Sequence, residues 1–151
     1  MDLNRNHPVA FFVNHYEHSV DSKGRIVLPA KFRSSLGDRV YLAPQDNSLA
    51  VYSETEYAEV IERLIGQVRS GGVDPMTRRG FATNSVEVDI DSAGRITIPS
   101  RLRDYANLTG DVVVNGMLTY IEIWDRAAFE AMEPELSAVV QEQFKAGGTI
   151  N

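Results

Sequence analysis

One phrase occurs twice in this chain, and it sets the strongest limit on the fold. DSKGRIVLP begins at Asp21, and DSAGRITIP begins at Asp91. When Glu17–Arg33 is aligned with Glu87–Arg103, eight of the 17 positions are identical, where composition alone would give about one. Similarity at a fixed offset is the signature of a repeated structural unit. We therefore predict that the 151 residues contain two copies of one supersecondary unit.

Each copy reads as two short strands, a short helix, two more strands and a longer helix. Before the second phrase, Val86, Val88 and Ile90 alternate with acidic residues, as expected of a strand with one buried face. The positions in the same phase of the first copy are Tyr16, His18 and Val20. This pattern predicts a mainly β protein with flanking helices, of the α+β class.

The phrase itself predicts a β-hairpin. Its Asp suits the first position of a turn, its Gly supplies a positive φ, and its Pro ends the second strand where a short helix begins. The residues with these roles are Asp21, Gly24, Pro29, Asp91, Gly94 and Pro99.

Two longer helices are expected. Ser53 and Glu56 form a capping box, and the apolar stripe from Tyr57 to Val68 follows, as a core contact rather than a subunit contact. Asp125 should cap the counterpart helix, which Pro134 should kink or split before an apolar stripe resumes. That stripe consists of Leu136, Val139, Val140 and Phe144.

These elements predict the domain organisation. We expect an N-terminal extension (1–11), a first repeat (12–72), a linker (73–81), a second repeat with its C-terminal helix (82–146) and a tail (147–151).

The net charge of −6 is unevenly distributed. Residues 1–81 carry 10 Lys and Arg against 10 Asp and Glu, whereas residues 82–151 carry 5 against 11. Residues 23–33 hold four cations and no acid, so a local basic site is compatible with an acidic protein. The chain has no cysteine, no signal-peptide pattern and no long apolar segment, so we expect a cytoplasmic protein that does not contact the membrane.

Arg25 and Arg95 are the main candidate binding residues, and the residues alone leave two interpretations open. Each guanidinium can protrude from a hairpin and bind guanine or phosphate, or it can form a structural ion pair with the Asp four residues earlier. Lys23 corresponds to Ala93, which indicates that the first loop attracts phosphate more strongly.

The helices after the two prolines carry further cations: Lys31, Arg33, Arg101 and Arg103. They can reach a DNA backbone or form a solvated charged face. We expect no catalytic, metal or cofactor site. His15 and His18 lie three apart on a strand and so face opposite ways, and Ser22 and Ser92 read as turn residues.

Together these features resemble the MraZ family, whose chains contain two SpoVT-AbrB-like repeats. YEHSVDSKGRIVLPAKFR, SVEVDIDSAGRITIPSRLRDYA and YIEIW carry the resemblance. It implies a swapped-hairpin β-barrel in which the two repeats form an intrachain pseudo-dimer. It also implies a ring-shaped homo-oligomer that associates with the nucleoid and binds direct repeats of double-stranded DNA in the promoter of its own division and cell wall gene cluster. The DNA-reading loop falls on Asp21, Lys23, Gly24 and Arg25, with a counterpart at Asp91, Gly94 and Arg95, so we favour DNA contact for Arg25 and, less strongly, for Arg95.

Two other functions are considered. An antitoxin-type module would act by binding a protein, and the stretch from Leu136 to Ile150 is the candidate contact. A small barrel enzyme has little support, because no cluster of His, Asp and Ser recurs outside the turns.

Overall fold

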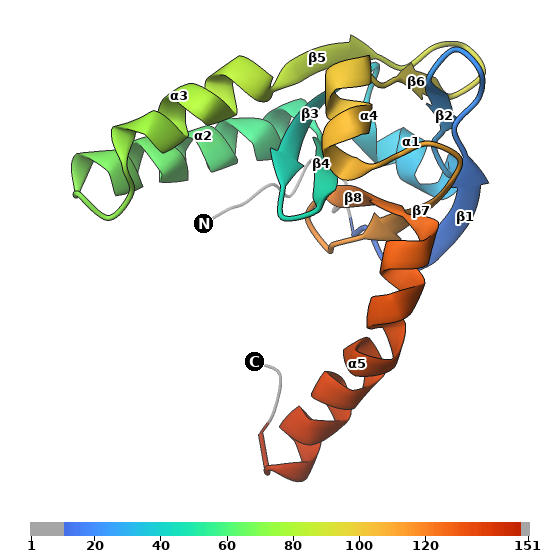
Figure 1. Cartoon of the computed structure of the whole chain (residues 1–151). Helices are drawn as coiled ribbons and strands as arrows, with labels where there is room; N and C mark the ends of the chain where they lie inside the picture. The colour runs from blue at the N-terminus through green and yellow to red at the C-terminus, as the bar shows by residue number, and fades with distance from the viewer. Residues whose placement is uncertain (1–10, 149–151) are drawn as a thin grey trace.

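The computed structural model describes residues 11–148 of the chain (Figure 1). Nearly all of the expected N-terminal extension and the last three residues of the expected tail lie outside them. The strands are β1 (His15–Ser19), β2 (Arg25–Val27), β3 (Arg39–Gln45), β4 (Ser48–Tyr52), β5 (Val86–Asp89), β6 (Arg95–Thr97), β7 (Asp111–Gly116) and β8 (Ile121–Asp125). The helices are α1 (Ala30–Leu36), α2 (Glu54–Arg69), α3 (Pro75–Asn84), α4 (Ser100–Ala106) and α5 (Arg126–Lys145). The predicted α+β class is confirmed.

The two copies of the repeated phrase pair with each other. β2 and β6 form a two-stranded antiparallel ladder in which Ile26 lies opposite Ile96. The N–H of Leu28 donates to the carbonyl of Gly94, and the N–H of Ile98 donates to the carbonyl of Gly24, both at 2.9 Å. The predicted hairpin therefore closes only at its turn, because β1 and β2 then separate and take partners from the other repeat.

The remaining strands continue this exchange. They form one six-stranded sheet in the order β1-β7-β8-β4-β3-β5. β1 of the first repeat pairs with β7 of the second, β5 of the second pairs with β3 of the first, and β4 pairs with β8 at the centre. This arrangement confirms the swapped, intrachain pseudo-dimer that the resemblance implied.

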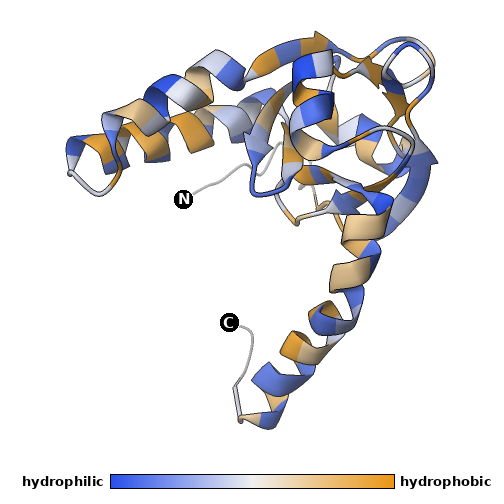
Figure 2. Ribbon diagram, viewed as in Figure 1, coloured by the Kyte–Doolittle hydropathy of each residue, from blue (hydrophilic) through white to orange (hydrophobic). Residues whose placement is uncertain are grey.

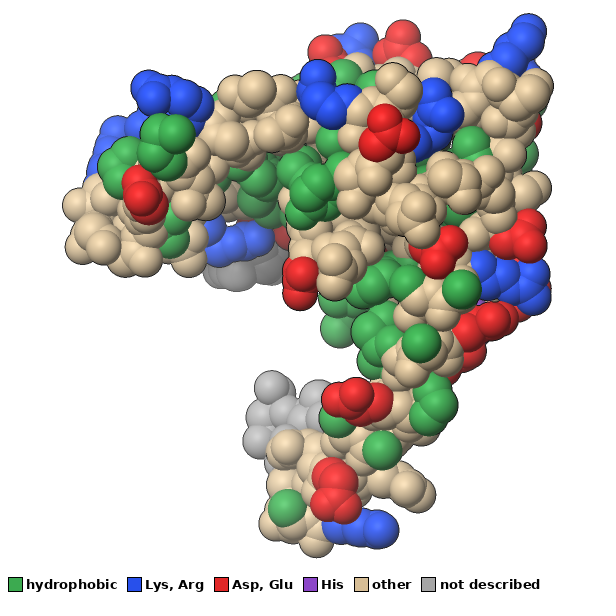
Figure 3. Space-filling view, viewed as in Figure 1, with side chains coloured by type: hydrophobic (Ala, Val, Ile, Leu, Met, Phe, Trp, Pro, Cys, Tyr) green, Lys and Arg blue, Asp and Glu red, His purple; other side chains and the backbone are tan. Residues whose placement is uncertain are grey.

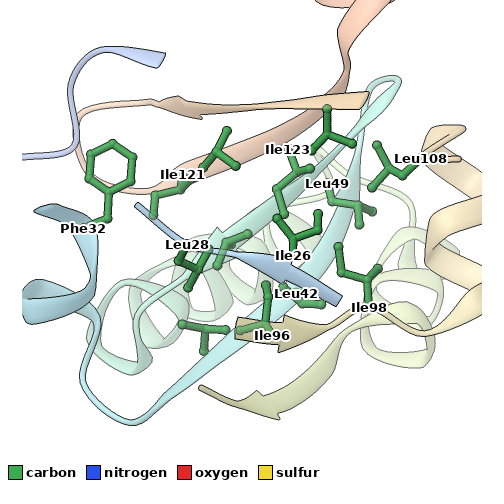
Figure 4. Packing of buried hydrophobic residues seen from close by; sticks show 14 of the residues in the cluster. Ile26, Leu28, Phe32, Leu42, Leu49, Ile96, Ile98, Leu108, Ile121 and Ile123 are labelled. Atoms are coloured by element: carbon green, nitrogen blue, oxygen red, sulfur yellow. The ribbon is translucent and has the colours of Figure 1, made fainter. Parts of the chain in front are cut away.

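The core lies between the ladder and the sheet. Ile26 and Ile96 in the ladder and Leu28 and Ile98 just after it are at most 1% exposed, and they pack with residues of the sheet and of α1 (Figure 4). The alternation predicted for β1 and β5 is confirmed, because Tyr16, His18, Val86 and Val88 are half-buried while their neighbours are exposed. Burial of these side chains from both repeats supplies the main force that holds the exchanged strands together.

The helix α2 begins as predicted, since the N–H of Glu56 donates to the Ser53 hydroxyl at 3.2 Å. Its stripe is half-buried throughout. Tyr57 and Val60 pack against a second cluster around Ala43, Ala50 and Tyr52, so this part of the stripe is core, as predicted.

The linker contains a helix that the sequence analysis missed. Asp74 caps α3 by accepting from the N–H of Met76 at 2.8 Å, and Pro75 occupies its first turn. Asp followed by Pro is a helix-start signal that could have revealed it. α2 and α3 project together from the sheet as a helical hairpin (Figure 1).

The helix α5 departs from expectation. Asp125 caps it as predicted, by accepting from the N–H of Ala128 at 3.1 Å, and Phe129 is buried. Pro134, however, lies inside one continuous helix and does not split it. The predicted apolar stripe beyond Pro134 is exposed, from 40% at Leu136 to 53% at Phe144, because α5 extends away from the sheet there (Figure 2). None of the helices within residues 11–148 is both long and apolar enough to cross a membrane.

Candidate nucleic-acid interface

The first loop is organised by one carboxylate. Asp21 Oδ1 accepts from the backbone N–H groups of Lys23 and Arg25, both at 2.9 Å. Asp21 Oδ2 forms an ion pair with Nε of Arg25 at 2.7 Å. The backbone N–H of Gly24 donates to the Asp21 carbonyl at 3.0 Å, and Gly24 has a φ of 79°. The Asp side chain therefore fixes both the turn and the direction of the arginine.

The second loop repeats this geometry. Asp91 Oδ1 accepts from the N–H groups of Ala93 and Arg95 at 2.9 and 2.8 Å, and Asp91 Oδ2 lies 2.8 Å from Nε of Arg95. The intrarepeat ion pair considered from the sequence is thus present in both copies.

The ion pair with the Asp uses only the Nε atom of each guanidinium. The Arg25 and Arg95 side chains are 27% and 33% exposed. Both use Nε toward the Asp, and the part of the chain that the structure describes offers no hydrogen bond to their terminal amino groups. A guanidinium held in this way keeps its two-pronged donor edge, which suits guanine or phosphate.

The pKa values of the loop carboxyls reflect the same contacts. The backbone N–H of Arg25, followed by its side chain, lowers the pKa of Asp21 from 3.8 to about 2. The pKa of Asp91 is also lowered, chiefly by the backbone N–H of Arg95. Hydrogen bonds that favour the charged form keep both carboxylates ionised.

Each loop is covered by an arginine from the other repeat. Arg103 of α4 lies over Gly24, where an added Cβ would be 2.9 Å from the Arg103 Nε. Arg33 of α1 lies over Gly94 so closely that an added Cβ would overlap its guanidinium. Both glycines are therefore required by their positive φ and by this close approach. Arg103 Nε also donates to the Ile98 carbonyl at 2.9 Å, whereas Arg33 Nε is buried without a partner among the described residues.

The other predicted cations occupy different positions. Lys23 is exposed at the tip of the first loop, where the second loop has Ala93. Lys31 and Arg101 are exposed, whereas Arg33 and Arg103 are half-buried. Sequence reasoning missed the crossed packing of Arg33 and Arg103, because residues that are distant in sequence give no sign of packing on one another's turns. A phosphate contact by Lys31 or Arg33 stays a prediction.

The β2–β6 ladder connects the two loops. It is three residues long and antiparallel, with Arg25 opposite Thr97 and Arg95 opposite Val27, so the two loops enter it from opposite ends. The ladder lies at the upper right corner of the molecule in Figure 1. Figure 3 shows Lys and Arg side chains at this corner and along α3 and α4.

The histidines of β1 lie apart, as expected. His15 is exposed and His18 is half-buried on the opposite face, where burial lowers the pKa of His18. Residues 11–148 contain no group of three His, Cys, Asp or Glu that could hold a metal ion.

Comparison with known proteins gives a consistent result. A family model described as "MraZ protein, putative antitoxin-like" matches residues 11–71 and 81–146. The chain is 36% identical to the transcriptional regulator MraZ of Desulforamulus reducens over 135 residues, which are 84% of this chain and 90% of that protein. It is 38% identical to the transcriptional regulator MraZ of Mycolicibacterium gilvum over 139 residues, which are 89% and 92% of the two chains. A 40% identity to the regulator of the same name from Caldanaerobacter subterraneus covers 76% of this chain and 81% of that one.

The crossed arginines predict a crossed mutational response. Arg33→Ala should loosen the second loop and leave the first intact, and Arg103→Ala should do the reverse. If each substitution lowers the local free energy of unfolding by about 1–2 kcal/mol, amide exchange should become about 5- to 30-fold faster. The faster residues should be 93–95 in Arg33→Ala and 23–25 in Arg103→Ala. Native-state hydrogen exchange measures this, with Lys31→Ala as the exposed control on α1. Equal loosening of both loops by either variant would contradict the crossed arrangement.

The Asp21 contacts predict a pH response. Because the folded pKa is lowered from 3.8 to about 2, the contribution of this carboxylate to stability is complete above pH 4 and is lost as the pH falls toward 2. An NMR titration of the Asp21 carboxyl should show this midpoint, and the amide shifts of Lys23 and Arg25 should follow it. Asp21→Asn should remove that response. A midpoint at the ordinary value would mean that these hydrogen bonds do not form in solution.

Proposed function

Because the chain belongs to the MraZ family, we propose that it is a transcriptional regulator that binds double-stranded DNA on the nucleoid. The relatives named above are transcriptional regulators, and their sequences align with most of this chain. Such a protein acts by binding and not by catalysis, so the loops are assigned recognition roles.

One observation carries the proposal. In both loops an aspartate holds the arginine by Nε at 2.7–2.8 Å and leaves the terminal amino groups free of hydrogen bonds within residues 11–148. A guanidinium fixed in this way loses little conformational entropy when it binds. Its free edge can donate two hydrogen bonds to guanine O6 and N7 in the major groove.

The two loops have unequal roles in this proposal. Lys23 beside Arg25 adds a phosphate contact that Ala93 cannot supply beside Arg95. Arg25 is therefore the main base-contacting residue, and Arg95 makes the weaker contact. Asp21 and Asp91 act by positioning these arginines.

Several copies of the unit act together. One pair of loops binds weakly, whereas a ring homo-oligomer that presents many pairs can gain ~10²- to 10⁴-fold in affinity through linked contacts. The operator is then a set of short direct repeats about one helical turn apart, in the promoter of the protein's own division and cell wall gene cluster. The net charge of −6 is compatible with this, because the acidic surface need not face the DNA.

Substitution of Arg25 tests the proposal. Arg25→Ala should reduce binding to the upstream DNA of its own gene by at least ~10-fold, since one bidentate contact is worth about 1–3 kcal/mol and recurs in every subunit. Arg95→Ala should lose less, and Lys145→Ala, on the exposed end of α5, should lose nothing. Gel retardation at low salt measures the affinity, and light scattering measures the oligomer.

The opposite outcomes are distinct. Wild-type protein that fails to retard this DNA at low salt would exclude the proposed function. A collapse of the fold or oligomer in Arg25→Ala would show that the ion pair with Asp21 has a purely structural role.

A second candidate function is the binding of a protein partner. The exposed apolar residues of α5 beyond Pro134 favour it, and the matched family model is described as antitoxin-like. Exposed apolar faces of this kind commonly mark interaction sites.

Truncation of α5 distinguishes the two functions. A chain that ends at Glu135 lacks the exposed stripe but retains both loops and the buried Phe129. We expect it to bind promoter DNA within ~2-fold of the full chain, because the stripe lies outside the charged surface on which DNA affinity depends. Loss of DNA binding by a folded truncated chain, measured in the same retardation assay, would contradict the assignment of recognition to the loops.

A further inference from the structure

The outer face of α3 carries two arginines without acidic partners. Arg78 and Arg79 are exposed and, with Pro75, Ala82 and Thr83, line a shallow hollow on one side of the helix. No ion pair to either arginine occurs within residues 11–148, and the contact to Arg79 is the sulfur of Met76 at 3.7 Å. The packing of α3 against α2 is provided by Phe81 instead. The centroid of its ring lies 6.0 Å from that of Tyr57 in α2. The arginines are therefore not needed to hold α3 in place.

A contact links this face to the loops. Arg101 of α4 donates from Nη2 to the carbonyl of Thr83 at 3.4 Å, so it reaches the last turn of α3. Two residues later, Arg103 lies over Gly24 of the first loop. Cations thus occur at intervals from α3 through α4 to the first loop. On the upper side of Figure 3 the Lys and Arg side chains are separated by other side chains, acidic ones among them.

The other arginines of the sheet and of α5 are neutralised. Arg39 lies 2.9 Å from Glu87 and 3.5 Å from Asp89. Arg126 lies 3.1 Å from both Glu17 and Glu130. Arg101 donates to a neutral carbonyl and keeps its charge uncompensated, and Asp104 is the one acid carried by α4. Arg78, Arg79 and Arg101 therefore differ from Arg39 and Arg126, because no acidic partner within residues 11–148 offsets their charge.

We propose that Arg78, Arg79 and Arg101 form a second DNA-contacting surface, which binds backbone phosphates beside the base pairs reached by the loops. This inference rests on the proposed function. Exposed guanidinium groups without acidic partners suit phosphate, and contacts of this kind set position and affinity while the loops set sequence. The projection of α3 from the body extends the footprint beyond the repeat element itself.

Matched DNA lengths and variants provide the test. The long probe is the upstream region of the protein's own gene, and the short probe is that region trimmed to the shortest duplex that wild type still binds. The main variant is Arg78→Ala/Arg79→Ala. Arg78→Lys/Arg79→Lys keeps the charge, and Lys145→Ala removes an exposed cation from α5 instead. For each, the affinity is measured as a function of salt, and the oligomer mass is measured by light scattering.

The expected result is a change in the salt dependence. On the long probe the Ala pair should flatten the slope of log K against log salt by about 1–2 for each subunit that contacts the DNA, since each lost phosphate contact is worth about 0.9. The Lys pair and Lys145→Ala should keep the wild-type slope, and the short probe should not distinguish the proteins. The oligomer mass should not change.

Three outcomes would overturn the inference. An unchanged slope for the Ala pair on DNA that wild type binds would remove the second surface and leave the proposed function in place. A fall in oligomer mass would show instead that this face contacts a second copy of the chain. Wild type that fails to bind the long probe would exclude both the inference and the proposed function.

Discussion

The pairing of β2 with β6 is the interaction on which the rest of the structure depends. Each strand is three residues long, too short to be stable as an isolated hairpin. Its side chains gain burial only when the two copies meet, with Ile26 opposite Ile96 in the centre of the core. The exchange of β1 and β5 between repeats follows from this pairing. Because β1 leads into β2 and β5 leads into β6, each of them lies beside a strand of the other repeat, β1 beside β7 and β5 beside β3. Neither repeat can therefore bury its apolar face without the other.

The same crossing organises the proposed interface. A turn between exchanged strands lies beside the short helix of the opposite repeat, so Arg103 covers Gly24 and Arg33 covers Gly94. The arginine that supports each loop thus lies far away in the sequence, 79 residues after Gly24 in one case and 61 residues before Gly94 in the other. The pseudo-symmetry is nevertheless incomplete. Lys23 has no cationic counterpart, and only Arg103 satisfies its Nε within the described residues. These differences separate the two loops chemically while their backbones stay alike.

Local signals in the sequence were reliable where a residue acts on its own neighbours. Asp21, Ser53 and Asp125 bond to backbone groups within four residues, and the composition of those segments predicted each contact. The alternation in β1 and β5 was equally readable, because it reports one buried face. The helix α3 was not predicted, although Asp74 followed by Pro75 is a signal for the start of a helix. The sequence predicts that an apolar stripe resumes beyond Pro134 but not that it is exposed, because periodicity reports an apolar face and not whether anything covers it.

The sequence alone determined the duplication, the turns, the caps and the strand phases, since these depend on residues a few positions apart. It also supplied the family resemblance and the candidate Asp and Arg pairs. Only the tertiary structure decided which strand pairs with which, where Arg33 and Arg103 lie, and that α2 with α3 and the end of α5 project from the sheet. Those features depend on how two equivalent apolar surfaces bury one another. A repeated sequence specifies both surfaces equally and cannot by itself say that they belong together.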